Sequence, residues 1–274
     1  MSTVVAGVSG MAWPPSRVDC VQRHYEEPPM PDVTSNDRLA RFGRALVVAA
    51  HPDDVDFGAA GTVALLVRAG CEVRYLIVTD GQAGGFDRDL DRSQMPAVRR
   101  AEQVAAAATV GVTDVDFLGL TDGEVVPDLA LAEQISRSIR QHTPDLVLTF
   151  SPERNYERVG VSHPDHRAVG DATIDAVYPF ARNPFAFPHL LDDEGLDAHI
   201  VTDLWLMGHP TTDTYIDVTE VFDRKVAAIA CHASQLTDPA ALADAMRGWL
   251  GDAARRGGLP EGRLAESFWA VQIT

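Results

Sequence analysis

The sequence predicts an α/β fold in which a mostly parallel sheet carries helices on both faces, in a Rossmann-like arrangement. Short apolar runs rich in branched residues alternate with longer stretches of helical periodicity, the order typical of βαβ units. Strands are predicted at 45–50, 72–79, 114–119 and 145–150, and helices at 57–69, 95–110 and 128–141. In such a sheet ligands bind beyond the carboxyl ends of the strands, so the active site is expected there.

The chain after the fourth predicted strand is less regular. A helix is expected over about 163–177, and a loop rich in proline and aromatic residues follows at 182–193. The remaining predicted elements are strands at 204–207 and 214–218, a helix at 219–232, a helix at 239–255 interrupted by Gly248 and Gly251, and an extended segment at 268–273. The parallel sheet is therefore predicted from the first half of the chain.

The first 43 residues differ from the rest in composition. They contain five prolines and no clear period, so they are interpreted as a loosely ordered N-terminal extension, residues 1–43. The remaining residues, 44–274, are long enough to bury a sizeable core and are predicted to form one domain.

Charge and cysteine content limit the partners. A formal net charge of −17 disfavours a nucleic-acid backbone and an anionic membrane surface, so a small-molecule substrate is expected, with no nucleic acid and no membrane. No run approaches membrane-spanning length. Three cysteines leave one unpaired in any bridging scheme, which favours the reducing cytoplasm. Assembly as a homo-oligomer stays open.

Two tetrads of similar composition follow two of the predicted strands. Residues 51–54 read His-Pro-Asp-Asp directly after the first strand, and residues 163–166 read His-Pro-Asp-His one loop beyond the strand at 145–150. The carboxyl ends of parallel strands meet at one edge of a sheet, so both tetrads are expected in one cleft. Histidines and carboxylates gathered there predict a metal hydrolase.

Three of the tetrad side chains are candidate metal ligands. His51 and Asp54 stand three positions apart across a turn that begins with proline, and His166 can supply a third ligand. Three protein ligands leave one coordination position for water, which distinguishes a catalytic zinc site from a closed structural one.

The other tetrad side chains are candidates for the proton transfers. Asp53 is free to take a proton from water, and His163 can stabilise an oxyanion or protonate a leaving amine, with Asp165 orienting an imidazole. A single His-Pro-Asp more often forms a turn, and Asp53 or Asp54 can cap the following helix. This chain has two His-Pro-Asp motifs, each between a predicted buried strand and a predicted helix, and this repetition argues against a purely structural role as turns.

At these positions the chain resembles the LmbE/PIG-L family of zinc-dependent N-acetylglucosaminyl deacetylases. The resemblance runs from about residue 44 to residue 235 and rests first on the two tetrads. Further agreement comes from Gly58-x-x-Gly61-Thr62, Thr79-Asp80-Gly81, Arg99-x-x-Glu102, Asp122-Gly123 and His232-x-Ser234-Gln235.

The resemblance implies an LmbE-like hydrolase that acts on the carbon–nitrogen bond of linear amides. Members remove the acetyl group of N-acetylglucosamine linked to inositol, phosphatidylinositol, other sugars or small metabolites. The implied cofactor is Zn²⁺, although Fe²⁺ or another divalent metal also suits a His/His/Asp ligand set. A mycothiol-conjugate amidase and a non-catalytic metal-binding homologue remain alternatives.

By position, the resemblance gives the six tetrad residues the same roles and adds Arg99 and Asp80 as candidate substrate contacts. Substrate specificity is expected from residues 151–162 and 180–200, which flank or follow the second tetrad. These segments offer Arg154, a third candidate contact, together with Asn155, Arg158, Asn183, Phe185 and Phe187.

Two other α/β classes fit less well. A receiver domain needs a lysine late in the sheet, whereas Lys225 falls inside a predicted helix, and a dinucleotide-binding fold needs a glycine-rich turn that 58–61 does not supply. His232 is expected to be a hydrogen-bonded core residue, and His209, which follows a predicted strand, is expected near the cleft without a catalytic role.

Overall fold

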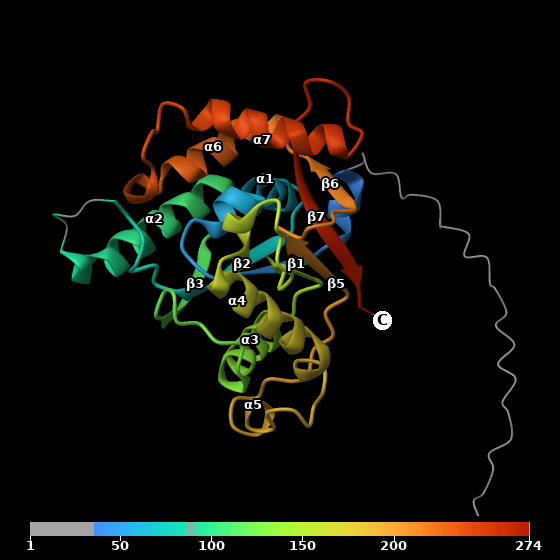
Figure 1. The fold of residues 1–274 in the computed structure, drawn as a ribbon. Helices are drawn as coiled ribbons and strands as arrows, with labels where there is room; N and C mark the ends of the chain where they lie inside the picture. Colours follow the sequence, from blue (N-terminus) through green and yellow to red (C-terminus); the bar gives the residue numbers. More distant parts are fainter. Residues whose placement is uncertain (1–35, 87–88, 90, 274) are drawn as a thin grey trace, which may run out of the picture. The chain divides into compact units, whose positions relative to one another are not determined.

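The computed structural model describes residues 36–86, 89 and 91–273, and its seven-stranded sheet confirms the α/β prediction (Figure 1). The strand order is β3-β2-β1-β4-β5-β7-β6. The first five strands in that order are parallel to one another, and β7 runs antiparallel to both of its neighbours. The strands are β1 (Arg44–Ala49), β2 (Glu72–Thr79), β3 (Asp114–Leu120), β4 (Leu146–Phe150), β5 (Asp203–Met207), β6 (Thr214–Asp217) and β7 (Ala265–Gln272).

Helices cover both faces of this sheet, as predicted (Figure 1). Residues of β1 alternate between the two cores: Ala45, Val47 and Ala49 pack in one, and Leu46 and Val48 pack in the other. This alternation follows from the two-residue period of a strand that is buried on both faces. The first core includes α1 (Asp54–Arg68), α2 (Met95–Val110), α6 (Phe222–Ala230) and α7 (Leu242–Arg256), and the second includes α3 (Leu129–His142) and α4 (Pro164–Asp175).

Several boundaries differ from the sequence-based expectation. Helix α1 begins at Asp54, directly after the turn, and the residues predicted as one helix at 219–232 form a 3-10 turn (Thr219–Val221) followed by α6. The predicted interruption of α7 is wrong, because the helix runs through Gly248 and Gly251 without a break. A glycine costs a helix only about 1 kcal/mol, and burial of the apolar side of α7 outweighs that cost.

The predicted N-terminal extension is wrong for its last residues, 36–43. Residues Asn36–Arg41 form a 3-10 helix whose Leu39 is 1% exposed, and Phe42 packs edge-on against Trp205 at a ring distance of 5.7 Å. Two apolar side chains buried in the first core tie this segment to the sheet. The rest of the extension, residues 1–35, lies outside the described residues.

The strand order places a topological switch point beside β1. The chain proceeds from β1 through β2 to β3 on one side and then returns to add β4 on the other side. Ligands of open α/β sheets bind at the carboxyl ends of such strands. The tetrads therefore flank the crevice. Gly170 in α4 allows this helix to pack closely on β4, since a Cβ at position 170 would lie 2.2 Å from the carbonyl oxygen of Phe150.

Two further observations bear on location. None of the helices in the described part of the chain has the length and apolar character to cross a membrane. Cys71 and Cys231 are free thiols, and Cys20 lies outside the described residues. The cytoplasmic location stays a prediction.

Candidate metal centre and active site

The three predicted metal ligands converge at the crevice between β1 and β4. His51 Nδ1 lies 3.2 Å from His166 Nε2 and 3.4 Å from Asp54 Oδ2, and His166 Nε2 lies 3.0 Å from Asp54 Oδ1. A tetrahedral metal with bonds of about 2.0–2.1 Å separates its ligand atoms by about 3.3 Å. The two Asp54 distances involve different carboxylate oxygens, so the three side chains face one another at about this spacing without yet presenting a single set of three donor atoms.

Both imidazoles are oriented by a hydrogen bond at the other ring nitrogen. His51 Nε2 lies 3.1 Å from Asp165 Oδ2 and 3.3 Å from Asp122 Oδ1, and His166 Nδ1 lies 3.1 Å from the carbonyl oxygen of Val161. A proton on each of those nitrogens leaves His51 Nδ1 and His166 Nε2 with a free lone pair. Metal-ligating histidines are commonly held in this way.

The charge at the crevice also favours a cation. Burial by itself would lower the pKa of His51, but Asp54, Asp122 and Asp165 outweigh burial and raise that pKa to about 12. Burial likewise opposes ionisation of Asp54, yet His166 and His51 hold its pKa well below the usual range. Several carboxylates therefore surround the imidazoles, and a divalent cation would balance the excess negative charge.

Asp53 lies beside the ligands in an uncommon backbone conformation. Its φ of 100° is in the left-handed region, which costs energy for a residue with a Cβ and is common at functional sites. Its N–H donates to Gln103 Oε1 at 2.8 Å, and its Oδ2 accepts from Arg99 Nη2 at 2.9 Å. Burial raises the pKa of Asp53 to about 6 although Arg99 acts in the opposite direction, and a carboxylate with that pKa suits a general base.

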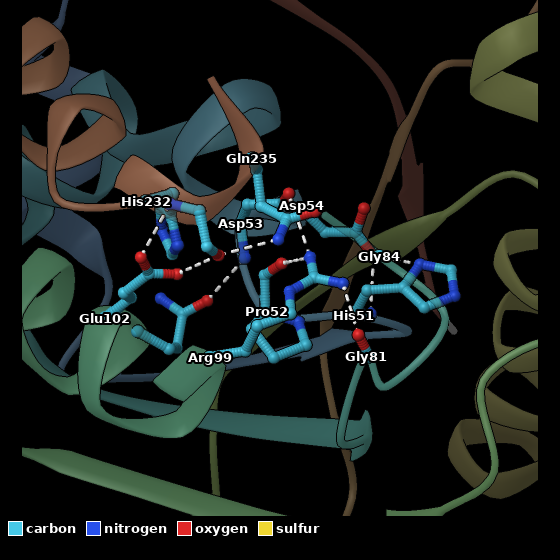
Figure 2. A network of polar contacts seen from close by, with 12 residues as sticks. His51, Pro52, Asp53, Asp54, Gly81, Gly84, Arg99, Glu102, His232 and Gln235 are labelled. Atoms are coloured by element: carbon cyan, nitrogen blue, oxygen red, sulfur yellow. Dashed lines mark hydrogen bonds and ion pairs between the residues drawn. The ribbon is translucent and has the colours of Figure 1, made fainter. Parts of the chain in front are cut away.

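Arg99 reaches the site as predicted, but its terminal nitrogens bind protein atoms (Figure 2). Besides Asp53 it donates to the carbonyl oxygen of Gly81 at 2.9 Å and to the carbonyl oxygen of Pro52. Gly81 has a φ of +61°, and a Cβ there would lie 2.3 Å from Arg99 Nη1, so glycine makes room for the guanidinium. These contacts make Arg99 a residue that positions Asp53.

His163 lies at the start of α4 and faces the predicted metal ligands. Its ring centroid is 4.9 Å from that of His51, and its ligand atoms lie within 4.8 Å of those of His51 and His166. His163 Nδ1 accepts a hydrogen bond from the N–H of Asp165 at 3.2 Å, which puts the ring proton on Nε2. Burial lowers the pKa of His163, so the neutral ring can donate that proton in a hydrogen bond.

Asp165 has a different partner from the one expected. The sequence placed it behind His163, whereas its carboxylate contacts His51 and accepts from the N–H of Gly123 at 2.6 Å. As the second residue of α4 it is fully buried and points toward the loop after β3. Asp165 therefore orients a predicted metal ligand.

Two predicted substrate contacts lie away from the crevice. Asp80 Oδ1 accepts from Arg100 Nε at 2.8 Å at the end of β2, and Arg154 is exposed and lines neither of the two cavities described below. The predicted second specificity segment, 180–200, also lies elsewhere, because Arg140 of α3 binds its backbone carbonyls and Phe187 packs on Phe180. The first predicted specificity segment, 151–162, does reach the site, where Asn155 and Arg158 line the larger cavity.

Two cavities meet at the candidate metal site. The smaller is polar and includes His51, Asp53, Arg99, Asp122 and His163 in its lining. The larger has a volume of about 400 Å³ and extends from the same site toward α7. Both are lined by Asp54, Gly160 and His166.

Sequence reasoning missed three contributors to this region. Asp122 was named only as part of the family resemblance and was given no role at the site, although its position after β3 was a usable signal. Nothing in the sequence indicated a role for Gln103 or Trp249, because only the packing of α2 and α7 brings these residues to the site. His232 was predicted correctly as a hydrogen-bonded core residue: it is fully buried, with Nε2 2.8 Å from Asp56 Oδ2.

The fold and this arrangement of residues define a hydrolase with a candidate metal centre, and comparisons with known proteins identify the family. The family model described as PIG-L, GlcNAc-PI de-N-acetylase, matches residues 46–177. A diacetylchitobiose deacetylase from Thermococcus kodakarensis is 30% identical over 76% of this chain and 75% of its own length. A probable N-acetyl-alpha-D-glucosaminyl L-malate deacetylase 2 from Bacillus cereus is 33% identical over 69% of this chain and 82% of its own length.

A solved structure supports the same assignment. The N,N'-diacetylchitobiose deacetylase from Pyrococcus horikoshii, in complex with an inhibitor, superposes with a TM-score of 0.77 at 28% identity and covers 85% of each chain. This chain belongs to the PIG-L family, and it is an N-deacetylase. The predicted family and the predicted class of enzyme are confirmed.

Proposed function

We propose that this deacetylase uses a zinc ion held by His51, Asp54 and His166 to hydrolyse the acetamide of an N-acetylglucosamine derivative. The observation that carries the proposal is the convergence of these three side chains: the two imidazole nitrogens lie 3.2 Å apart, and each lies 3.0–3.4 Å from one of the two carboxylate oxygens of Asp54. Zinc and ferrous iron both accept this ligand set, and zinc is proposed because the family resemblance implies it.

In this proposal Asp53 carries the proton transfers and His163 stabilises the oxyanion. When bound, the metal supplies Lewis acidity that polarises the amide carbonyl and makes water a better nucleophile at neutral pH. Asp53 accepts a proton from the attacking water, and His163 Nε2–H donates a hydrogen bond to the developing oxyanion. Asp53 then returns its proton to the nitrogen as the carbon–nitrogen bond breaks, which yields acetate and the free amine.

The substrate class follows from what the relatives share. Their printed names specify diacetylchitobiose, an N-acetylglucosaminyl malate, and an inositol glycoside of 2-acetamido-2-deoxyglucose. All three contain a 2-acetamido sugar joined to a second group, so we propose a small N-acetylglucosaminide as the substrate. Because these relatives are deacetylases, deacetylation is favoured over the mycothiol-conjugate amidase.

Metal exchange tests the proposal. The full chain is stripped with a chelator, reloaded with Zn²⁺ or, without oxygen, with Fe²⁺, and assayed for acetate released from a panel of N-acetylglucosaminides. We expect no activity in the stripped protein and recovery at one zinc per chain. Full activity without metal would refute the metal-dependent mechanism, and higher activity with iron would refute the choice of zinc.

The domain boundary is also a proposal. Because Leu39 and Phe42 are buried in the core, we place the start of the hydrolase domain near Asn36 instead of Arg44. A chain shortened to Arg44 would expose a hydrophobic surface that these side chains now cover.

A further inference from the structure

We propose that the larger cavity binds the group attached to the amino sugar, the aglycone, and selects one that is apolar near the metal and anionic at its outer end. The inference rests on the proposed function, since it assumes that the acetamide lies at the metal site. The anion is a carboxylate or a phosphate, which share the chemistry that guanidinium groups recognise.

The cavity begins at the metal ligands. Asp54 and His166 line it together with the smaller cavity, so a substrate with its acetamide at the metal can extend into the larger space. A volume of about 400 Å³ is enough for a ring or a short chain beyond the sugar. The apolar part of the wall consists of Phe57, Phe150, Met207, Trp249, Leu250 and Ala253.

A buried histidine in the wall has an unpaired ring nitrogen. His209 is 6% exposed, and its Nδ1 lies against the backbone of Thr211, 3.0 Å from the amide nitrogen and 2.5 Å from the carbonyl oxygen. Among the described residues Nε2 has no hydrogen-bond partner, and Glu153 Oε2 lies 3.5 Å from it. A buried polar atom left unpaired costs about 1–3 kcal/mol, and a polar group on the ligand would recover that cost.

Two arginines stand at the outer end. Arg158 lies over the ring of Trp249 at 4.4 Å, and Arg256 comes from the last turn of α7; both are exposed and both line the cavity. Burial lowers the pKa of Arg158, and the charge of Arg256 lowers it further, so the two guanidinium groups repel each other. Within 36–86, 89 and 91–273, neither makes a salt bridge.

The remaining charges of the wall do not cancel this pair. Glu266 is committed to Lys225 at 2.7 Å, and Asp54 is a proposed metal ligand, which leaves Glu157 as the other exposed charge on the rim. Among the exposed residues that line the cavity, two arginines face one glutamate, a local excess of positive charge in a chain whose formal net charge is −17; Glu153, beside His209, does not line the cavity. An anionic aglycone is complementary to that rim.

Matched substrates test this selectivity. The zinc-loaded full chain is given three aryl N-acetylglucosaminides whose para substituent is a neutral carboxamide, a carboxylate or a phosphate, and kcat/KM for acetate release is measured at low salt. We expect one or both anionic substrates to exceed the carboxamide by about tenfold, because two charge contacts at an exposed rim supply roughly that factor at low salt. The two anionic arms identify which anion is preferred. Added salt should reduce the preference, since the rim is exposed.

The variant that tests the mechanism is Arg158→Gln combined with Arg256→Gln. It should bring the ratio of kcat/KM between the anionic and neutral substrates close to one. Arg247→Gln is the matched control: Arg247 is also on α7, is also exposed and also lies over an aromatic ring, that of Phe222 at 4.3 Å, but it does not line the cavity. The control should keep the ratio of the parent protein.

The outcomes separate this inference from the proposed function. Turnover of all three substrates at equal kcat/KM would overturn the inference and leave the deacetylase mechanism standing. If none is hydrolysed, calorimetry with the corresponding aryl glucosides, which lack the acetamide, decides instead. Binding of the anionic glucosides that is lost in the double variant supports the cavity assignment, and equal binding of neutral and anionic glucosides refutes it.

Discussion

Two clusters of buried charge lie along α1, and they differ in how their charges balance. In one, Lys225 Nζ lies 2.7 Å from Glu266 Oε1 and donates to the carbonyl oxygens of Asp56 and Phe57, while Glu266 accepts from the N–H groups of Gly61 and Thr62. One cation meets one anion, and the hydrogen bonds of both are satisfied. Such a pair braces the helix and leaves nothing for a ligand to complete.

In the other cluster the carboxylates outnumber the cations. Asp54, Asp122 and Asp165 surround His51, and Asp53 lies beside them with Arg99 as its partner. The same helix thus carries a balanced cluster near Glu266 and an unbalanced one at its first turn. The contrast shows that burial of charge alone does not mark a functional site, whereas buried charge without compensation predicts a missing cation.

The largest difference between the clusters should appear when Asp54 is replaced by alanine. The change removes a proposed ligand and part of the excess negative charge, so zinc content should fall to near zero and deacetylation should be lost. The metal-free variant should unfold at about the same temperature as the metal-free parent. Metal analysis and thermal unfolding with and without zinc test this, and an Asp54→Ala protein that still binds one zinc per chain would contradict the ligand assignment.

Replacing Asp53 by asparagine separates catalysis from metal binding in the unbalanced cluster. The amide still accepts from Arg99 but cannot take a proton from water, so kcat should fall by about 10²–10⁴-fold while zinc content stays at the parent level. Steady-state kinetics with metal analysis on the same sample is the measurement. An Asp53→Asn enzyme with parent activity would remove Asp53 as the base.

Lys225→Met should give the opposite pattern. It leaves the buried Glu266 without its cation, which should lower the free energy of unfolding by about 3–5 kcal/mol. Zinc binding and activity per folded molecule should change little, because Lys225 does not touch the metal ligands. Chemical denaturation measures the loss, and the double variant Lys225→Met with Glu266→Gln should recover part of it. A stable variant that had lost zinc would contradict this separation and show that the two clusters act as one functional unit.

The sequence predicted the parts of this molecule that depend on short-range pattern. The buried strands follow from runs of apolar residues, and the position of each tetrad after a strand is enough to place His51, Asp54 and His166 together, since parallel strands end at one edge. The boundaries that were wrong are those where tertiary burial overrides local preference. Gly248 did not break α7, because that helix is held by the core, and Phe42 did not stay in the extension, because its own side chain is buried in the core.

The parts that were not predicted depend on pairs of residues far apart in the chain. Asp165 was assigned to the histidine nearest in sequence, but its carboxylate meets His51, 114 positions away. Trp249 lies on α7, which packs near the edge of the sheet formed by β7 and β6, so nothing in the local sequence associates it with the tetrads. Both cases are decided by tertiary packing, which sets the direction of the Asp165 side chain and the position of α7, and not by residue type.

The smallest of these effects concerns the contact that the sequence missed. Asp165→Asn keeps the size of the side chain but weakens the acceptor that holds the proton on His51 Nε2, so Nδ1 becomes a poorer and less fixed ligand. Loss of such an outer partner commonly weakens metal affinity by about 10–100-fold, and we expect a change in that range, with zinc still bound at saturation. Competition with a zinc-binding dye measures it. The matched control is Asp80→Asn, which removes a carboxylate that pairs with Arg100 on the surface of α2 and does not line either cavity. Zinc affinity should be unchanged in that control. If the two variants bind zinc equally well, the hydrogen bond from His51 to Asp165 does not tune the metal centre, and Asp122, the other carboxylate beside Nε2, becomes the residue to test.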